Sequence, residues 1–319
     1  MERKPEAKGQ HYVHRAYLQG FVDPDTNDEF LWLYMPKKHP YKQRPERVAK
    51  RNYFYCHLNE EKRSFDTEHI LQRLEDAALP LLRKLNQRDF SLSDDERITF
   101  AGYVALAHTR VPTFQKFIDE TTSWFTAKQL EFLIRSDNSI LERYAKKLSE
   151  EKGEEISVEG LKREMSAGSV TLDQTNRGWS LRHMFRAMLT IQEVVYRIHW
   201  TFLIAPDDDP GFLTSDNPIS LYDPAAGFGT GFESSPQAYF TFALSKSLCL
   251  LARHYKAQSV ANATSREVRR INKGTVGRAD TQIYAPFNSM KIQEMLNEVV
   301  GRRRGSGKIY LRHGRAVRE

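Results

Sequence analysis

The stretch SLRHMFRAMLTIQEVVYRIHWTFLIA, residues 180–205, contains the transition that decides the fold class. Its first part is apolar on every side except one charged stripe, which is typical of a helix at the centre of a domain. That stripe consists of Arg182, Arg186, Glu193 and Arg197. From Trp200 to Ala205 the residues are aromatic, aliphatic and β-branched, which favours a strand. The stretch therefore predicts a central helix followed directly by a strand.

Helical periodicity dominates the residues before this stretch. Apolar side chains recur at helical spacing from Asp66 to about Gly153. Ser93 and Glu96 have the spacing of a capping box, in which each side chain bonds the other's backbone N–H at a helix start. After the helix that begins at this capping box, we expect separate helices over residues 113–135, 138–151 and 159–165, and a loop over 168–178.

Short apolar runs separated by Pro, Asp and Gly follow the stretch, and they predict strands. The expected strands are 211–215, 239–244 and 248–253, with earlier ones at 30–35 and 53–56 and later helices at 264–277 and 289–300. The predicted fold is α+β, with a large helical portion and a small, mainly antiparallel sheet.

We expect one domain over residues 11–300. Its helical part covers about 66–200, and its sheet-forming part covers about 200–255 plus 30–56. Residues 1–10 are expected to be a flexible arm, and 301–319 a basic tail.

The net charge of +7 is concentrated in two segments. Residues 37–51 and residues 300–319 each carry seven basic residues and one acid, so the rest of the chain is mildly acidic. Basic segments of this kind can follow the phosphates of nucleic acid without reading its sequence. The alternative is that both are solvated surface segments.

Compartment and membrane signals are few. Cys56 and Cys249 lie in apolar runs and are expected to be buried thiols, which excludes a disulfide framework. No window has the roughly 18 apolar residues that a membrane helix needs. The N-terminal residues lack the apolar core of a signal peptide. We therefore expect a cytoplasmic protein with no membrane partner, and the sequence does not indicate its oligomeric state.

The first candidate functional stretch is HYVHRAYLQGF, residues 11–21, which we predict to be a short helix. On a helix His11 and Arg15 would point the same way, so that His11 could move a proton while Arg15 holds a phosphate. His11 and His14 could also bind a metal with a third ligand from elsewhere. The alternative is a solvated polar helix face.

The second candidate is FLTSDNP, residues 212–218, an apolar strand that runs into a polar turn. Asp216 could ligate a metal or act as a base there, with Asn217 as a hydrogen-bonding neighbour. The alternative is a turn whose Asx side chains only end the strand. A third candidate, Arg110 in Arg110-Val111-Pro112, follows a helix end, where the helix dipole alone also favours a cation.

These motifs resemble a bacterial family catalogued as domain of unknown function 4238. The family opens on His-Tyr-(Val/Ile)-Pro-(Arg/Gln)-x-Tyr-Leu-x-x-Phe, which residues 11–21 match except that His14 replaces the proline. The resemblance extends to about Tyr284. Its later matches are Phe54-Tyr55, the Arg110-Val111-Pro112 helix end, the Thr214–Pro218 turn, Leu244-Ser245, Asn272 and Ala279. The family name implies no reaction.

Two functions are consistent with these residues. The first is a phosphoesterase or nuclease in which His11 and Asp216 are catalytic groups or metal ligands. The residues that would bind substrate are Arg15, Arg110, Asn217 and Asn272. Mg²⁺ or Mn²⁺ is a candidate cofactor, and nucleic acid would bind through residues 37–51 and 302–318. The second is a non-catalytic protein-interaction module in which the same motif residues are structural.

Overall fold

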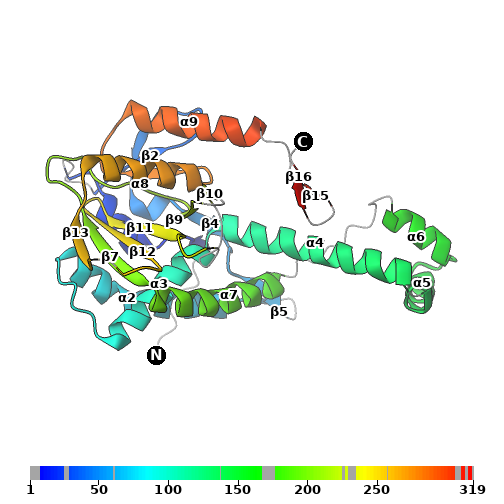
Figure 1. Cartoon of the computed structure of the whole chain (residues 1–319). Coiled ribbons are helices and arrows are strands. Elements are labelled where there is room, and N and C mark those ends of the chain that lie inside the picture. Colours follow the sequence, from blue (N-terminus) through cyan, green and yellow to red (C-terminus); the bar gives the residue numbers. More distant parts are fainter. Residues whose placement is uncertain are drawn as a thin grey trace. The chain divides into compact units, whose positions relative to one another are not determined.

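The structure is a computed structural model of the chain. It describes residues 8–24, 29–59, 62–136, 138–166, 177–224, 227–228, 235–256, 258–305, 310–312 and 315–317 (Figure 1). The chain divides into two compact units. The first contains Met1–Phe114 and Met184–Glu319, and the second contains Gln115–His183.

The larger sheet of the first unit is built mainly from strands that follow the apolar helix. Its strand order is β10-β9-β11-β12-β7-β13, and the neighbours are antiparallel except β13, which is parallel to β7. Most side chains of the central strands are buried because helices cover both faces of the sheet (Figure 1). The strands are β7 (His199–Ile204), β9 (Ile219–Asp223), β10 (Gly227–Phe228), β11 (Tyr239–Ser245), β12 (Leu248–Arg253) and β13 (Val260–Asn262).

The second sheet joins three distant parts of the sequence. Its order is β3-β2-β14-β8, with all neighbours antiparallel. Its strands are β2 (Leu31–Tyr34), β3 (Tyr41–Gln43), β8 (Thr214–Ser215) and β14 (Ile283–Ala285). The helices α8 (Ser265–Arg278) and α9 (Met290–Gly305) contribute Val276 and Leu296 to a core with Tyr34 and Ile283. The predicted α+β class with mostly antiparallel sheets is confirmed.

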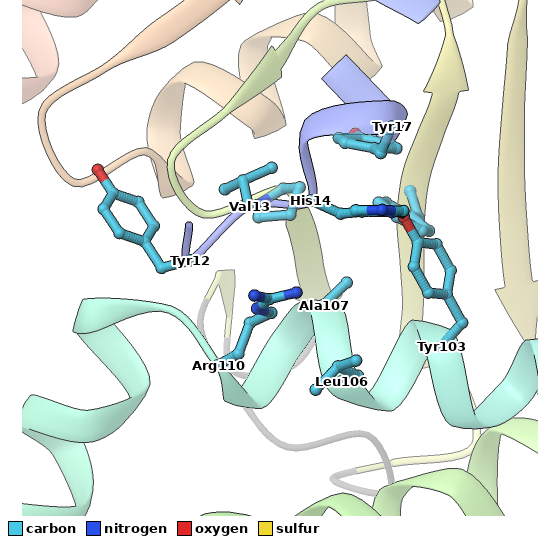
Figure 2. A pocket seen from close by; sticks show the side chains of 10 residues that line it. Tyr12, Val13, His14, Tyr17, Tyr103, Leu106, Ala107 and Arg110 are labelled. Carbon is cyan, nitrogen blue, oxygen red and sulfur yellow. Dashed lines mark hydrogen bonds between the residues drawn. The ribbon is translucent and has the colours of Figure 1, made fainter. Parts of the chain in front are cut away.

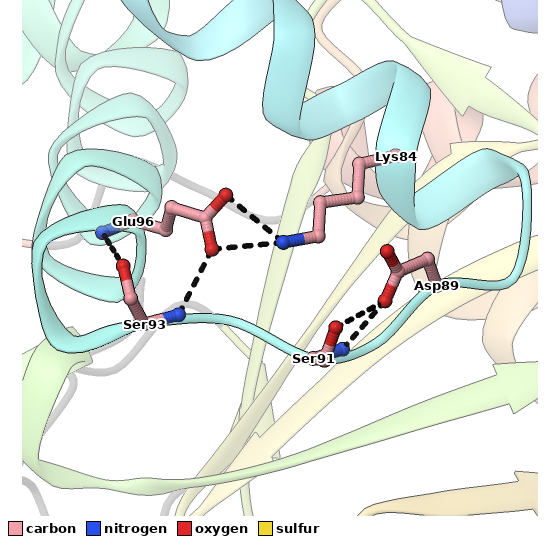
Figure 3. Close-up of polar contacts among 5 residues, drawn as sticks. All are labelled: Lys84, Asp89, Ser91, Ser93 and Glu96. Carbon is pink, nitrogen blue, oxygen red and sulfur yellow. Dashed lines mark hydrogen bonds and ion pairs between the residues drawn. The ribbon is translucent and has the colours of Figure 1, made fainter.

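Helices α2 (Asp66–Asn86) and α3 (Asp94–Thr109) lie on the side of the sheets opposite to α8 and α9 (Figure 1). The predicted capping box begins α3: the Glu96 N–H donates to Ser93 Oγ over 3.2 Å, and the Ser93 N–H donates to Glu96 Oε2 over 2.9 Å (Figure 3). Lys84 Nζ, near the end of α2, lies 2.9 Å from both carboxylate oxygens of Glu96. The cap therefore also joins the two helices.

The second unit is helical. It contains most of α4 (Pro112–Ser136), all of α5 (Asn138–Lys152) and α6 (Val158–Ser166), and the start of α7 (Arg177–Arg197). Leu141, Ala145 and Leu161 form its small core. The predicted helices are confirmed here, while most of the predicted loop over 168–178 lies outside the described residues.

The prediction of a continuous helix over residues 11–21 is wrong. The stretch forms β1 (Gly9–His11), α1 (Arg15–Leu18) and the 3₁₀ turn η1 (Gln19–Phe21). The reason is pairing with a distant segment, since β1 is antiparallel to β4 (Lys50–Asn52). His11 and Arg15 therefore do not share a helix face, and residues 9 and 10 of the predicted arm lie in a strand.

Two other segments differ from expectation. Residues 53–56, predicted as a strand, form a turn in which Tyr53 has a φ of 53° and the Cys56 N–H donates to Tyr53 O over 3.2 Å. The hairpin of β5 (His57–Asn59) and β6 (Lys62–Ser64) follows this turn. The basic segment 37–51 contains β3, the 3₁₀ turn η2 (Pro45–Arg47) and the start of β4.

The predicted basic tail begins inside α9, which continues to Gly305. Beyond it, β15 (Tyr310–Arg312) and β16 (Arg315–Val317) form an antiparallel pair. Within the described part of the chain, no helix combines the length and the apolar character needed to cross a membrane.

Candidate functional site

The opening motif joins β1 to the larger sheet through Tyr17. Its hydroxyl donates to the Ala243 carbonyl of β11 over 2.7 Å and lies 2.6 Å from Thr214 Oγ1 of β8. Its ring is stacked on Phe242 with 5.1 Å between centroids. The tyrosine of the motif is therefore a fixed structural anchor, and it positions His14, three residues earlier.

Arg110 occupies the centre of the cluster beneath this motif. It directly follows α3, and its side chain is only 3% exposed. Its Nε donates to Tyr55 Oη over 3.2 Å, Nη1 pairs with the carboxylate of Glu75, and Nη2 donates to the backbone carbonyl of His11. Burial opposes its charge, but Glu75 and Tyr55 outweigh this and raise the pKa of Arg110. All three guanidinium nitrogens thus have partners within the chain.

Two carboxylates of α2, Glu68 and Glu75, belong to this cluster and were not among the predicted residues. Burial raises the pKa of Glu68 to about 7, while Arg110 opposes the shift and Glu75 adds to it. A signal was present in the sequence. Glu68 and Glu75 fall on the same helical stripe as the buried Leu71, and acids on a buried stripe indicate a polar cluster.

The two histidines of the motif have different surroundings. His14 directly precedes α1, and its Nδ1 lies 3.2 Å from Tyr103 Oη and 3.9 Å from Glu75 Oε1. His11 ends β1 opposite Lys50, and its buried Nε2 has no hydrogen-bond partner among the described residues. Burial lowers the pKa of both rings, with Arg110 acting in the same direction. Both imidazoles are therefore held in the neutral form that can accept a proton.

A small pocket lies where three sequence motifs meet (Figure 2). Tyr12, Val13, His14 and Tyr17 line it from the opening motif. The lining from α3 and its end is Tyr103, Leu106, Ala107 and Arg110, and Pro218 and Phe242 complete it. In Figure 2 the ring of His14 points toward the hydroxyl of Tyr103. The enclosed space is on the order of one water molecule.

Asp216 lies in the turn that precedes Pro218, and its carboxylate accepts hydrogen bonds from other groups of the chain. Its Oδ1 accepts from the Asp280 N–H over 2.8 Å. Its Oδ2 accepts from the Thr281 and Gln282 N–H groups over 2.8 and 2.9 Å and from Thr281 Oγ1 over 3.1 Å. Burial raises its pKa to about 6, although the bonds from Thr281 and Asp280 oppose this and the Asp280 charge adds to it. In this structure Asp216 holds the turn to the loop after α8.

The two predicted asparagines also bond backbone groups. Asn272 Nδ2 donates to the Gly211 carbonyl over 3.0 Å, and its Oδ1 accepts from the Leu213 N–H over 3.0 Å. Asn217 Nδ2 donates to the Arg278 carbonyl over 3.1 Å. Neither asparagine lines the pocket. Both therefore hold the polar turn against α8.

Arg15 and the basic segment lie beside the opening motif. Arg15 is 60% exposed, and its Nη1 lies 3.9 Å from Glu46 Oε1 in η2. The guanidinium of Arg51 is 5.9 Å from the centroid of Tyr12, which lines the pocket. Together with the pairing of His11 and Lys50, these contacts place the positive charge of 37–51 next to the motif.

The predicted site residues are thus brought together in part. The motifs converge on one pocket, and Arg110 lines it, but Arg15 is on the surface and Asp216, Asn217 and Asn272 bond elsewhere. Among the described residues no group of three or more His, Cys, Asp or Glu side chains could hold a metal ion. The side chains of the other predicted contact, 302–318, lie outside the described residues.

Comparison with known proteins agrees with the resemblance of the motifs. No curated protein and no solved structure matches the chain. Residues 9–287 match the family described as "Protein of unknown function (DUF4238)". That match includes every residue that lines the pocket, from Tyr12 in the opening motif to Phe242 in β11. The chain therefore belongs to the DUF4238 family.

Proposed function

We propose that the chain is a phosphoesterase that acts on nucleic acid, as a nuclease or a related enzyme, and that the pocket is its reaction centre. One observation carries the proposal: the opening motif, the helix end at Arg110 and Pro218, which ends the polar turn, line the same pocket although they are far apart in the sequence. Sites of chemistry are commonly pockets in which a few polar groups converge on an apolar lining.

The roles follow from the contacts of each residue. His11 and His14 are the groups that can take a proton, because both rings are held neutral. Arg15 is the exposed cation that can meet a phosphate. Arg110 lines the pocket, whereas Asp216, Asn217 and Asn272 hold the neighbouring turn in place. The polar atoms of all four bond backbone and side chains of the chain itself. For Asp216 to act as a base it would have to give up one of its hydrogen bonds.

Nucleic acid is the substrate class that fits the surface beside the pocket. Segment 37–51 has a net charge of +6 and contacts the motif through η2 and β4. Its cations also lie over aromatic rings, with Lys42 Nζ 5.2 Å from the centroid of Trp32. A long polyanion could follow this segment while one phosphate lies at the pocket.

The proposal is tested by incubating the purified chain with end-labelled RNA and DNA, single- and double-stranded, with EDTA, Mg²⁺ or Mn²⁺. We expect cleavage, and we expect the variant Lys37→Glu/Lys38→Glu/Lys50→Glu to lose at least about tenfold in binding at low salt. The matched control is Arg266→Glu/Arg269→Glu/Arg270→Glu, which makes the same charge change at exposed positions of α8. Absence of cleavage under every condition would reject the proposal.

A non-catalytic interaction module is the second candidate, because the side chains of Asp216, Arg110 and Asn272 form hydrogen bonds with groups inside the fold. Melting and turnover of His11→Ala separate the two candidates, whereas Asp216→Ala should lower Tm under both because its carboxylate accepts four hydrogen bonds inside the fold. His11 meets Arg110 through its backbone carbonyl, which alanine keeps. A catalytic His11 therefore predicts lost turnover with little change in Tm, and a structural His11 predicts a lower Tm. A stable chain that turns over no substrate but binds a protein would favour the module.

The proposal also includes a cytoplasmic location. Its support is that Cys56 and Cys249 are both buried as thiols, as expected in a reducing compartment. Fractionation of cells that contain the tagged chain checks this directly.

A further inference from the structure

We infer that His14 is the general base of this pocket, that Tyr103 and Glu75 position it, and that it activates a water molecule against a phosphodiester. The inference rests on the proposed function and deepens it. It assigns the reaction to His14, which lies outside the predicted catalytic pair of His11 and Asp216.

His14 is the histidine that lines the pocket. Its side chain is 16% exposed, whereas Nε2 of His11 is buried and His11 is absent from the lining. Nδ1 of His14 faces Tyr103 and Glu75. Nε2 is therefore the nitrogen that remains to accept a proton from a molecule in the pocket.

Tyr103 and Glu75 have separate positioning roles. Tyr103 Oη, 3.2 Å from Nδ1, is within hydrogen-bond distance and can keep the proton on that nitrogen. Glu75 Oε1, at 3.9 Å, is too far for a hydrogen bond but close enough to stabilise the imidazolium when it forms. His14 directly precedes α1, while Glu75 and Tyr103 lie in α2 and α3, so the folded state holds the three residues at fixed separations.

Arg110 fixes the carboxylate of Glu75. The Glu75 side chain is 13% exposed and pairs with Nη1 of Arg110, which is itself tied to Tyr55 and to the His11 carbonyl. Because Arg110 holds this carboxylate in place, its negative charge stays beside the His14 ring, where it can stabilise the imidazolium. Arg110 thus acts through Glu75 and need not touch the substrate.

The charged groups around His14 keep its ring neutral before reaction. Burial lowers its pKa most, Glu75 and Asp76 of α2 oppose this, and Arg110 and Arg15 add to it. Burial also raises the pKa of Tyr103 well above its ordinary value, so its hydroxyl stays protonated. A neutral imidazole at neutral pH is the form that a general base requires.

The proposed step is a hydrolysis. Nε2 of His14 removes a proton from water while the water oxygen forms a bond to phosphorus. The bond from phosphorus to the leaving oxygen breaks, and the imidazolium returns its proton to that oxygen. The small pocket suits the water, while the polymer lies outside on the basic segment.

His14→Pro is the most informative variant. The φ of His14 is −58°, a value that proline adopts, and its side chain makes no cap hydrogen bond to α1. We expect this variant to fold with a modestly lower Tm, because the buried Tyr103 hydroxyl loses its contact with His14. It should keep its nucleic-acid affinity and lose at least about 100-fold in turnover. His69→Gln, which changes a histidine of α2 outside the pocket, is the control and should retain wild-type turnover.

The positioning role of Glu75 is tested by the pH profile of kcat/KM. A base works above its pKa, so activity falls as the pH drops through the pKa of His14. Removing the negative charge with Glu75→Gln should lower that pKa and move the acid limb down by about one pH unit. Glu75→Asp keeps the negative charge, so its acid limb should lie closer to that of the wild type. Loss of structure alone would reduce the rate without moving the limb.

If Glu75→Gln does not fold, ¹⁵N NMR of His14 in the wild type and in Tyr103→Phe replaces it. The expected result is a proton on Nδ1 in the wild type and a mixture of tautomers in Tyr103→Phe. An active wild type whose His14→Pro variant is equally active would overturn this inference and leave the proposed function standing. A wild type without any activity would overturn both.

Discussion

The carboxylate of Glu75 on α2 and the guanidinium of Arg110 after α3 form a buried ion pair under the opening motif. Because Arg110 also donates to the His11 carbonyl, the pair connects two helices to β1. Removing one partner of a buried ion pair leaves the other charge buried without compensation, which strongly destabilises the folded state. The pair therefore connects the stability of the fold to the geometry of the pocket.

Breaking the pair should destabilise the chain strongly. We expect Arg110→Leu to lower the free energy of unfolding by about 3–5 kcal/mol, since it leaves a buried carboxylate without its partner. Urea unfolding measures this. The control is Lys147→Ala, which breaks an exposed pair with Glu151 in α5 and should cost less than about 1 kcal/mol. Equal effects of the two substitutions would contradict the burial argument.

Two glycines with positive φ should respond differently to alanine. Gly211 has a φ of 96°, and a Cβ there would lie 2.1 Å from the Lys246 carbonyl oxygen. Gly153 has a φ of 69° with nothing within 4 Å of a Cβ. Gly153→Ala should cost about 1 kcal/mol from backbone strain alone, while Gly211→Ala should cost clearly more or prevent folding. Thermal melts compare them, and a smaller loss at Gly211 would count against the close approach.

Acid should destabilise the fold through His108. Burial lowers the pKa of His108 to about 3, with Arg278 acting in the same direction. The neutral ring therefore contributes stability above the unfolded value of about 6.5, and this is lost as the pH falls. Between these values the loss is about 1.4 kcal/mol per pH unit. Urea unfolding from pH 7 to pH 5 should show a shallower slope in His108→Gln than in the wild type.

Glu68 should act in the opposite direction. Its pKa of about 7 lies above the ordinary value of 4.5, so the protonated form contributes stability at low pH that is lost as the pH rises through 7. We expect Glu68→Gln to gain stability on the order of 1 kcal/mol relative to the wild type at pH 8. No gain is expected at pH 5, and a pH-independent difference would show that Glu68 is not the titrating group.

Much of the fold could be predicted because its signals are local. The capping box at Ser93 needs only two residues three apart, and the apolar runs of β7, β11 and β12 indicate strands without reference to partners. Propensity alone would end α2 at Pro80. The helix nevertheless continues to Asn86, because packing of its apolar stripe stabilises it.

The parts that could not be predicted depend on distant partners. Residues 9–11 form a strand only because β4 is available some forty residues later, and helical periodicity in so short a stretch could not reveal this. The site was found in part for the same reason. The motifs predicted which segments meet at the pocket. They could not reveal that Arg110 pairs with Glu75 of α2 or that Asp216 accepts hydrogen bonds from the loop after α8, because these partners are distant in the sequence.

Hydrolysis in ¹⁸O-labelled water measures the central claim most directly. The purified chain is incubated with labelled nucleic acid in that water, and the new phosphate ends are analysed by mass spectrometry. We expect product that carries one ¹⁸O per cleaved bond, formed by the wild type and not by His14→Pro. An absence of product, or product without the label, would contradict hydrolysis at this pocket.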